Sequence, residues 1–260
     1  MARAKSRPTS SPLPPSRGAG FVDTITLKRE EIPEAERELY PFDIPSIGGL
    51  DQLKLHPAIT FLVGENGSGK STLLEAIAVK LGFSAEGGSR NFQFSTRDSH
   101  SCLHHYLRIS RRPLRESDHF FLRAESFYTL MTQVEEYGSS WGDGSPHEQS
   151  HGEAFLCLLT EKLRGNGLYL FDEPEAALSA KRQMAALVRI HDLVGRNSQF
   201  IIATHSPILL AYPNASIYEC SETGLRPVTY QETEPFRTMR DFMQSPERWM
   251  ELLLGEQNAA

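Results

Sequence analysis

Short apolar runs alternate along the chain with longer stretches in which apolar residues recur at helical spacing. The short runs predict β-strands, which lie at residues 21–27, 53–55, 59–63, 104–110, 119–123, 168–171 and 199–203. The longer stretches predict helices, which lie at residues 70–81, 126–137, 150–165, 180–194 and 235–254. Strands that alternate with helices favour an α/β fold in which helices flank a mostly parallel sheet.

Changes in composition divide the chain into three parts. Residues 1–20 are rich in Arg, Lys, Ser and Pro and are predicted to be a disordered basic tail. A nucleic-acid-binding arm and an organelle transit peptide are the alternatives for this tail. Residues 21–233 are the predicted globular domain, with a helical part at 126–165, and residues 234–260 are expected to be a C-terminal helical segment. Within the domain, residues 40–45 are expected to be an extended aromatic segment.

Overall composition is that of a packed globular protein without a membrane span. The 260 residues are 39% hydrophobic and 23% charged, with a formal net charge of −6. No apolar run approaches the roughly 20 residues that a transmembrane helix needs, and no secretory signal is visible. Three widely separated cysteines form neither a disulfide framework nor a zinc pattern, which favours a reducing cytoplasm. Because the net charge is negative, the overall charge of the chain gives no support for nucleic-acid binding.

A glycine-rich turn joins the strand at 59–63 to the helix at 70–81. It fits G-x-x-x-x-G-K-[ST], the P-loop pattern, and the matching run is Gly64, Glu65, Asn66, Gly67, Ser68, Gly69, Lys70, Ser71 and Thr72. Glycines let successive backbone N–H groups point at one phosphate, and the helix N-terminus favours an anion. Lys70 is predicted to reach the outer phosphates, and Ser71 to place its hydroxyl on Mg²⁺. An ordinary glycine turn would leave the Gly-Lys-Ser-Thr run unexplained.

Two further strand ends carry residues that suit phosphate chemistry. The apolar strand at 168–171 is followed by Asp172 and Glu173, which is the Walker-B arrangement. Asp172 is predicted to hold Mg²⁺ through water, and Glu173 to activate the attacking water as a general base. His205 follows the strand at 199–203 within Thr-His-Ser-Pro, and is predicted to sense the γ-phosphate or stabilise the transition state. A turn at Asp-Glu-Pro and a structural histidine are the alternatives.

The helix that precedes the Walker-B strand begins at Ser150-His151-Gly152-Glu153. Serine followed three residues later by Glu is a capping box, and the structural interpretation ends there. The functional interpretation adds that a capped helix start, with Gly152 allowing close approach, is an anion site. Since the chain's own P-loop cannot present a phosphate to this helix, the site would serve a second subunit.

In this order, the P-loop, the Ser-x-Gly-Glu helix start, Asp-Glu-Pro and Thr-His-Ser-Pro resemble the ATP-binding cassette (ABC) ATPases. The forms of the motifs are most similar to the soluble SMC-, RecF- and OLD-like branch, and to small bacterial AAA/ABC ATPases of unassigned role. The resemblance implies a P-loop NTPase fold with a small antiparallel β element and a short helical insertion. It also implies ATP and Mg²⁺ as ligands, and a head-to-tail homodimer in which Ser150 and Gly152 act across the interface. Tyr40 lies about where the family stacks an aromatic side chain on adenine, and Phe42 is its competitor.

The chain departs from the family pattern at three places. Its signature is Gln-Ser-His-Gly-Glu, and Ser179 stands where many members have Asp in the D-loop. No glutamine stands at the position where the family places its Q-loop glutamine. By order of elements Glu125 takes that role and would coordinate Mg²⁺ through water, whereas Gln93 comes too early.

Two clusters of residues are not assigned as functional sites. His100, Cys102, His104 and His105 match no common zinc spacing. A basic patch made of Arg108, Arg111, Arg112 and Arg115 is expected to be a solvated face, with DNA contact as the alternative.

The expected function is that of a cytoplasmic Mg²⁺-dependent ATPase that dimerises on ATP and drives a conformational change in a partner protein. DNA repair and phage defence are the candidate settings. The alternatives are the nucleotide-binding subunit of an ABC transporter and a non-catalytic ATP switch in a DNA-associated complex.

Overall fold

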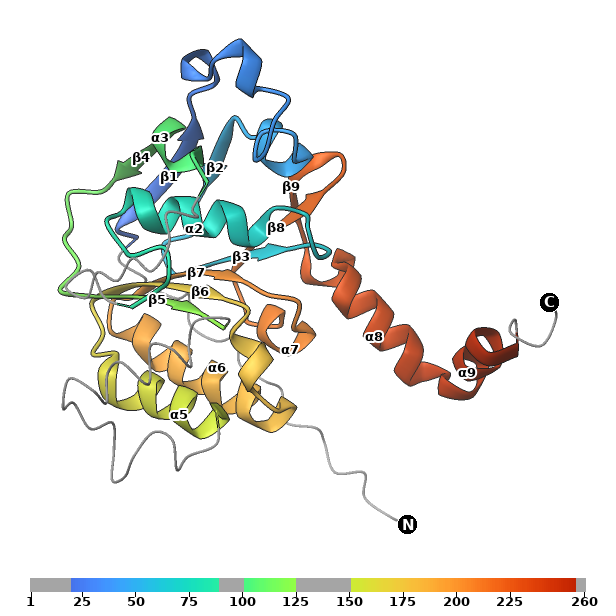
Figure 1. Cartoon of the computed structure of the whole chain (residues 1–260). Helices are drawn as coiled ribbons and strands as arrows, with labels where there is room; N and C mark the ends of the chain where they lie inside the picture. The colour runs from blue at the N-terminus through green and yellow to red at the C-terminus, as the bar shows by residue number, and fades with distance from the viewer. Residues whose placement is uncertain (1–19, 89–100, 125–150, 256–260) are drawn as a thin grey trace.

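A six-stranded sheet forms the centre of the molecule (Figure 1). A computed structural model describes residues 20–88, 101–124 and 151–255. The strand order is β5-β6-β7-β3-β8-β9, and every neighbouring pair is parallel except β8 and β9. The strands are β3 (Ile59–Val63), β5 (Asp118–Arg123), β6 (Gly167–Asp172), β7 (Gln199–Ala203), β8 (Ser216–Ser221) and β9 (Gly224–Val228). The mostly parallel sheet expected from the sequence is confirmed.

The central strands are apolar throughout because both faces of the sheet are covered. All residues of β3, β6 and β7 are buried. Along β3, Phe61 belongs to one apolar cluster and Leu62 to the other, as expected when successive side chains point to opposite faces.

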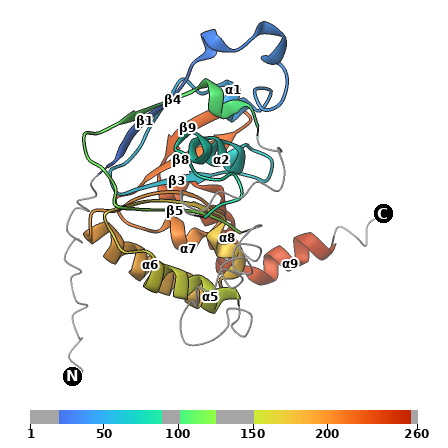
Figure 2. The same ribbon diagram turned by 60° about the vertical axis from the view of Figure 1, so that its left-hand side comes forward.

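Helices cover both faces of the sheet, as the first two figures show. On one face lies α2 (Lys70–Lys80), which buries Leu73, Leu74 and Ile77. The opposite face is covered by α5 (His151–Cys157), the π-helical turn η4 (Leu158–Lys162), α6 (Ala180–Gly195) and α7 (Pro207–Leu210). The helix that follows the P-loop and the helix that begins near Gly152 are therefore on opposite faces (Figure 2).

A separate antiparallel sheet has the order β2-β1-β4. Its strands are β1 (Val22–Leu27), β2 (Gln52–Lys54) and β4 (Leu107–Arg111), and Ile25 pairs with Leu53 on one side and Ile109 on the other. This sheet is the small antiparallel element that the family resemblance implies.

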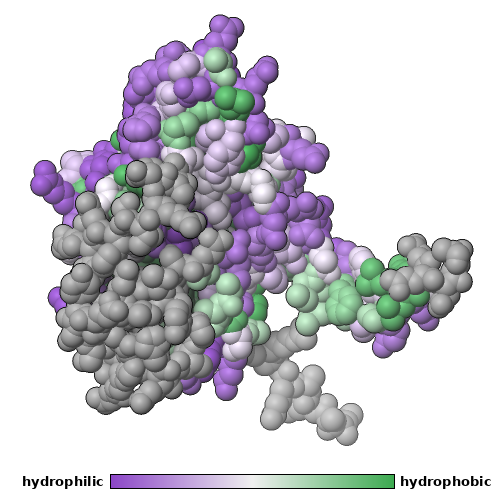
Figure 3. All heavy atoms as spheres, viewed as in Figure 1, coloured by the Kyte–Doolittle hydropathy of each residue, from purple (hydrophilic) through white to green (hydrophobic). Residues whose placement is uncertain are grey.

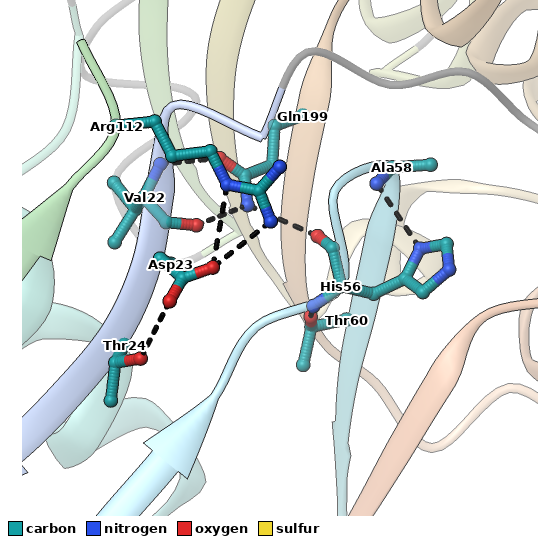
Figure 4. Close-up of polar contacts among 8 residues, drawn as sticks. All are labelled: Val22, Asp23, Thr24, His56, Ala58, Thr60, Arg112 and Gln199. Carbon is teal, nitrogen blue, oxygen red and sulfur yellow. Dashed lines mark hydrogen bonds and ion pairs between the residues drawn. The ribbon is translucent and has the colours of Figure 1, made fainter.

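The buried side chain of Gln199 connects the two sheets (Figure 4). Its Oε1 accepts from the backbone N–H of Val22 at 2.9 Å, and its Nε2 donates to the carbonyls of Val22 at 2.7 Å and His56 at 3.0 Å. Nearby, Nδ1 of His56 accepts from the N–H of Ala58 at 3.1 Å. The start of β7 is thus bonded to the start of β1, far away in sequence.

Two local predictions were wrong. Residues 104–110 were expected to be a strand, but α3 (Leu103–Tyr106) precedes β4. Leu103 and Leu107 are both fully buried, and their four-residue spacing matches one helical turn. Residues 40–45 were expected to be extended, but they form turns that lead into α1 (Pro45–Gly48). The fixed φ of Pro45 suits the first position of a helix.

The remaining elements are short or lie at the C-terminal end. The 3₁₀ turns are η1 (Arg29–Glu31), η2 (Glu34–Glu36), η5 (Pro174–Ala177) and η6 (Tyr230–Glu232). Residues 234–255 form two helices, α8 (Glu234–Gln244) and α9 (Pro246–Gly255). The predicted helix at 126–137, most of the basic tail, Gln93, Glu125 and Ser150 lie outside the described residues. Among the described helices, none is long and apolar enough to cross a membrane.

Candidate nucleotide site

The turn between β3 and α2 has the backbone that a phosphate-binding loop requires. Gly69 has φ 94° at the N-cap of α2. A Cβ at this position would come within 2.7 Å of Ser46 Oγ, and a Cβ on Gly64 would lie 2.2 Å from the carbonyl oxygen of Cys220. Both positions therefore need glycine. The hydroxyl of Ser46 also donates to the carbonyl of Ser68, which fixes the loop from outside.

The ammonium group of Lys70 lies inside this loop. Nζ donates to the carbonyls of Gly64 and Glu65, each at 2.8 Å, and the residue is 3% exposed. Burial lowers the pKa of Lys70, and the carboxylate of Glu173 is the largest influence that opposes this shift. A nearly dehydrated cation held by two carbonyls is well placed to bind an anion that enters the loop.

Ser71 and Asp172 meet at the ends of two different elements. Ser71 Oγ, in the first turn of α2, donates to Asp172 Oδ1 at 2.8 Å. Asp172 is the last residue of β6 and is 6% exposed. A hydroxyl and a carboxylate are hard oxygen ligands, so the pair fits Mg²⁺, which takes few protein ligands and completes its shell with water and phosphate. Within the described residues, no cluster of His, Cys, Asp or Glu offers a competing metal site.

Arg123 is a positioning residue that sequence reasoning missed. It ends β5, and its Nε lies 3.8 Å from Asp172 Oδ2. Its Nη1 contacts Glu75 Oε2 at 2.5 Å and donates to the carbonyl of Ala85 at 3.0 Å. Glu75 belongs to α2, so Arg123 connects the P-loop helix to the Walker-B carboxylate. An arginine at the end of an apolar strand, one strand before Asp172, was the available signal.

Glu173 and His205 also meet at this edge of the sheet. Glu173 adopts φ 50°, a left-handed conformation that is uncommon outside glycine, and its N–H donates to the carbonyl of Ala203 at 2.9 Å. His205 Nε2 lies 3.5 Å from Glu173 Oε1, and among the described residues this buried nitrogen has no hydrogen-bond partner. Strained backbone and an unsatisfied nitrogen are typical of sites that bind a further group.

Glu175 is a second positioning residue that the sequence-based prediction did not assign. Its Oε1 accepts from the backbone N–H of His205 at 2.5 Å, so it fixes the loop that follows β7. The signal was present in the run Asp-Glu-Pro-Glu. Downstream, Ser206 Oγ accepts from two N–H groups of α7 and bonds to Gln183 of α6 at 2.6 Å. The histidine loop is therefore held from both sides.

The two candidates for stacking on adenine differ in their exposure to solvent. Tyr40 is 62% exposed, and its hydroxyl lies 3.4 Å from Thr72 Oγ1 at the start of α2. Phe42 is buried and makes an edge contact with Tyr106 at 5.4 Å between ring centroids. Phe42 is thus a core residue, which leaves Tyr40 as the exposed aromatic beside the P-loop.

Gly152 has a packing role within its own chain. It is buried, and a Cβ would come within 2.6 Å of Arg182 Nη1 and 2.9 Å of the carbonyl of Ala177. The next residue, Glu153, bonds to Arg182 Nη2 at 2.9 Å. A close backbone contact explains the glycine, and it does not test the role that the family resemblance implies for Ser150 and Gly152.

The basic patch is partly neutralised. Arg111 pairs with Glu116, and Arg112 pairs with Asp23 at 3.0 Å. Two of its four guanidinium groups are thus engaged with acidic partners, which weakens the case for DNA contact there.

Two protein-family models match parts of the chain. A model of the AAA domain family matches residues 44–134. A second model, described as "AAA domain, putative AbiEii toxin, Type IV TA system", matches residues 112–211. No curated protein matches the chain.

Solved structures resemble the chain at low sequence identity. The SMC head domain from Thermotoga maritima is 15% identical, over 80% of this chain and 99% of that chain, with a TM-score of 0.46. A nucleotide-free ATP-binding cassette from an ABC transporter is 17% identical, over 75% of this chain and 88% of that chain, with a TM-score of 0.41. Both matched models describe an AAA domain, and between them they extend over the P-loop, Asp172, Glu173 and His205, so the chain is similar to AAA-domain proteins over residues 44–211.

Proposed function

We propose that the chain binds ATP with Mg²⁺ at residues 64–72 and hydrolyses it. One observation carries the proposal: Lys70, the Ser71–Asp172 pair and the Glu173–His205 pair lie at adjoining ends of parallel strands. In an open α/β sheet, ligands bind at this carboxyl edge. The three groups together offer an anion site, a hard cation site and a candidate base.

Each residue of the site has a separate proposed role. Lys70 and the loop N–H groups bind the β- and γ-phosphates. Ser71 and Asp172 hold Mg²⁺, which when bound neutralises charge that develops on the phosphate oxygens. Glu173 orients and deprotonates the attacking water, and His205 donates a hydrogen bond to the γ-phosphate. Glu175 keeps the histidine loop in place through its bond to the N–H of His205.

Two further ligand contacts remain proposals. Tyr40 would stack on adenine, supported by its exposure and its position beside Thr72. Glu125 would reach Mg²⁺ through water. Its neighbour Ala124 donates to the carbonyl of Asp172 at 3.1 Å, which brings the chain close to the Walker-B end at that point.

The proposed reaction cycle includes a second copy of the chain. Since α5, which begins beside Gly152, and α2 lie on opposite faces of the sheet, Gly152 would act with Ser150 on ATP bound by the partner. A partner protein, a cytoplasmic location, and a setting in DNA repair or phage defence belong to the same proposal.

Phosphate release by the purified chain tests hydrolysis. The wild-type chain is expected to release phosphate from ATP only when Mg²⁺ is present, and Lys70→Ala is expected to abolish that release. Unchanged turnover in Lys70→Ala would refute the assignment of the site. A wild-type chain that binds ATP without releasing phosphate would instead identify the non-catalytic switch.

A further inference from the structure

The C-terminal helices α8 and α9, residues 234–255, form an arm that leaves the domain. At its base, Phe236 packs on Tyr230 with ring centroids 4.5 Å apart, and α8 contacts η6 and α7. Beyond this base, both helices extend away from the central sheet (Figures 1 and 2). Most of the arm is therefore surrounded by solvent.

The arm carries an unusual amount of exposed apolar surface. Its side chains with 38–72% exposure are Met239, Phe242, Met243, Met250, Leu252, Leu253 and Leu254. Figure 3 shows hydrophobic residues gathered on these helices, whereas polar residues predominate on the coloured part of the domain surface in this view. A patch of this kind on a globular protein is typical of an interaction site.

The size of the patch fits a dimer of arms. At about half exposure and about 150–200 Å² per side chain, these residues leave roughly 600 Å² of apolar surface on each arm. Two arms would bury at most about 1,200 Å², which is reached only if all of this surface is covered and is the lower limit of a stable, specific interface.

The spacing of the apolar residues suits helix pairing. In α8, Met239 and Met243 are separated by four residues, and in α9, Met250 and Leu253 are separated by three. This spacing places each set on one face of its helix. Helices of 11 and 10 residues are too short to be stable alone in water, so packing against a partner helix would stabilise them.

The charges on the arm favour a protein helix over a membrane or DNA. Acidic residues outnumber basic ones, with Glu234, Asp241, Glu247 and Glu251 against Arg237, Arg240 and Arg248. An anionic membrane or a phosphate backbone selects a basic face. A second arm is complementary, because antiparallel pairing would bring Arg237 and Arg240 of one copy beside Glu247 and Glu251 of the other, although Arg240 also pairs with Asp241 of its own chain at 2.7 Å.

We propose that the arm pairs antiparallel with the arm of a second copy of this chain and joins the two chains without nucleotide. Two ATPase domains tethered in this way remain at high effective concentration between rounds of ATP binding. The pairing does not depend on the nucleotide site, so Lys70→Met should leave it intact.

The mass of the nucleotide-free chain in solution tests the proposal. Light scattering at micromolar concentration should give twice the 29.2 kDa of one chain. The double variant Met243→Glu with Leu253→Glu should be monomeric. The matched control, Met184→Glu with Val188→Glu, changes side chains that are 57% and 65% exposed on α6, and should remain dimeric. A monomeric wild type, or an arm variant that remains dimeric, would overturn the proposal.

Cysteine cross-linking tests the orientation of the arms. Met243→Cys, near the middle of the arm, should form a disulfide between chains, whereas Leu254→Cys at the tip should not. The reverse order of yields would contradict antiparallel pairing. If the wild-type chain were monomeric and bound to phosphatidylcholine vesicles, the partner of the arm would be a lipid surface, and the proposal would be overturned.

The ATP-dependent contact is measured separately in the monomeric arm variant. With Glu173→Gln added, this chain should remain monomeric alone and become dimeric with Mg²⁺ and ATP. Failure of that step would count against the proposed action of Ser150 and Gly152 across the interface, and not against arm pairing.

Discussion

Replacement of Lys70 by Met separates the role of its charge in nucleotide binding from its role in folding. Met preserves much of the apolar stem but removes the ammonium group that donates to the carbonyls of Gly64 and Glu65. Losing hydrogen bonds from a charged group costs about 1.5–3 kcal/mol each. Removing a buried cation whose pKa burial already lowers offsets much of that loss. Without nucleotide, the free energy of unfolding should therefore change by no more than about 2 kcal/mol.

Nucleotide should stabilise the wild-type chain but not Lys70→Met. A ligand present at about 100 times its Kd adds about 2.7 kcal/mol to the free energy of unfolding. In a chain of this size, that gain corresponds to a rise in Tm of roughly 5–10 °C. Lys70→Met should show no rise when Mg²⁺ and ATP are added.

Thermal unfolding followed by circular dichroism measures both effects. The matched control is Lys80→Met, because Lys80 lies on the same helix but is exposed. This control should keep the full ATP-dependent rise in Tm. If Lys70→Met shows the same rise as the wild type, the assignment of the P-loop as the nucleotide site is refuted.

The remaining predictions concern the fold that supports the site. Gln199→Leu should lower the free energy of unfolding, measured by urea denaturation, by about 3 kcal/mol, because buried polar groups of Val22 and His56 lose their partner. The control Gln52→Leu changes an exposed residue of an edge strand and should have little effect. Burial lowers the pKa of His56 from 6.5. The contribution of neutral His56 to the free energy of unfolding should therefore be complete above pH 6.5, and it should be lost as the pH falls through the folded-state pKa. His56→Asn should weaken that loss between pH 7 and pH 5, and an unchanged slope would contradict the explanation.

Local patterns in the sequence predict the strands well because each central strand is a continuous apolar run. β3, β6 and β7 are buried on both faces, so their sequences contain little that could suggest another structure. The strand predicted at 104–110 was wrong at its start because Leu103 and Leu107 fit both a strand end and a helical turn. Burial against the core selects the helix there.

The residues of the candidate site were predictable where a motif fixes their spacing, as at Lys70 and Asp172. Contacts that depend on the tertiary fold were not. Gln199 bonds to Val22 across 177 residues, and no local pattern contains that information. Tyr40 and Phe42 are equivalent in sequence, and only packing against Tyr106 makes the second a core residue.

Phosphate release by Glu173→Gln, measured beside ATP-dependent thermal stabilisation, tests the central claim most directly. The wild-type chain should release phosphate in the presence of Mg²⁺ and ATP. Glu173→Gln should keep the ATP-dependent rise in Tm but release phosphate at least about 100-fold more slowly, because a general base contributes that much. Equal phosphate release by both chains would contradict the account, as would a wild-type chain that ATP stabilises but that releases no phosphate.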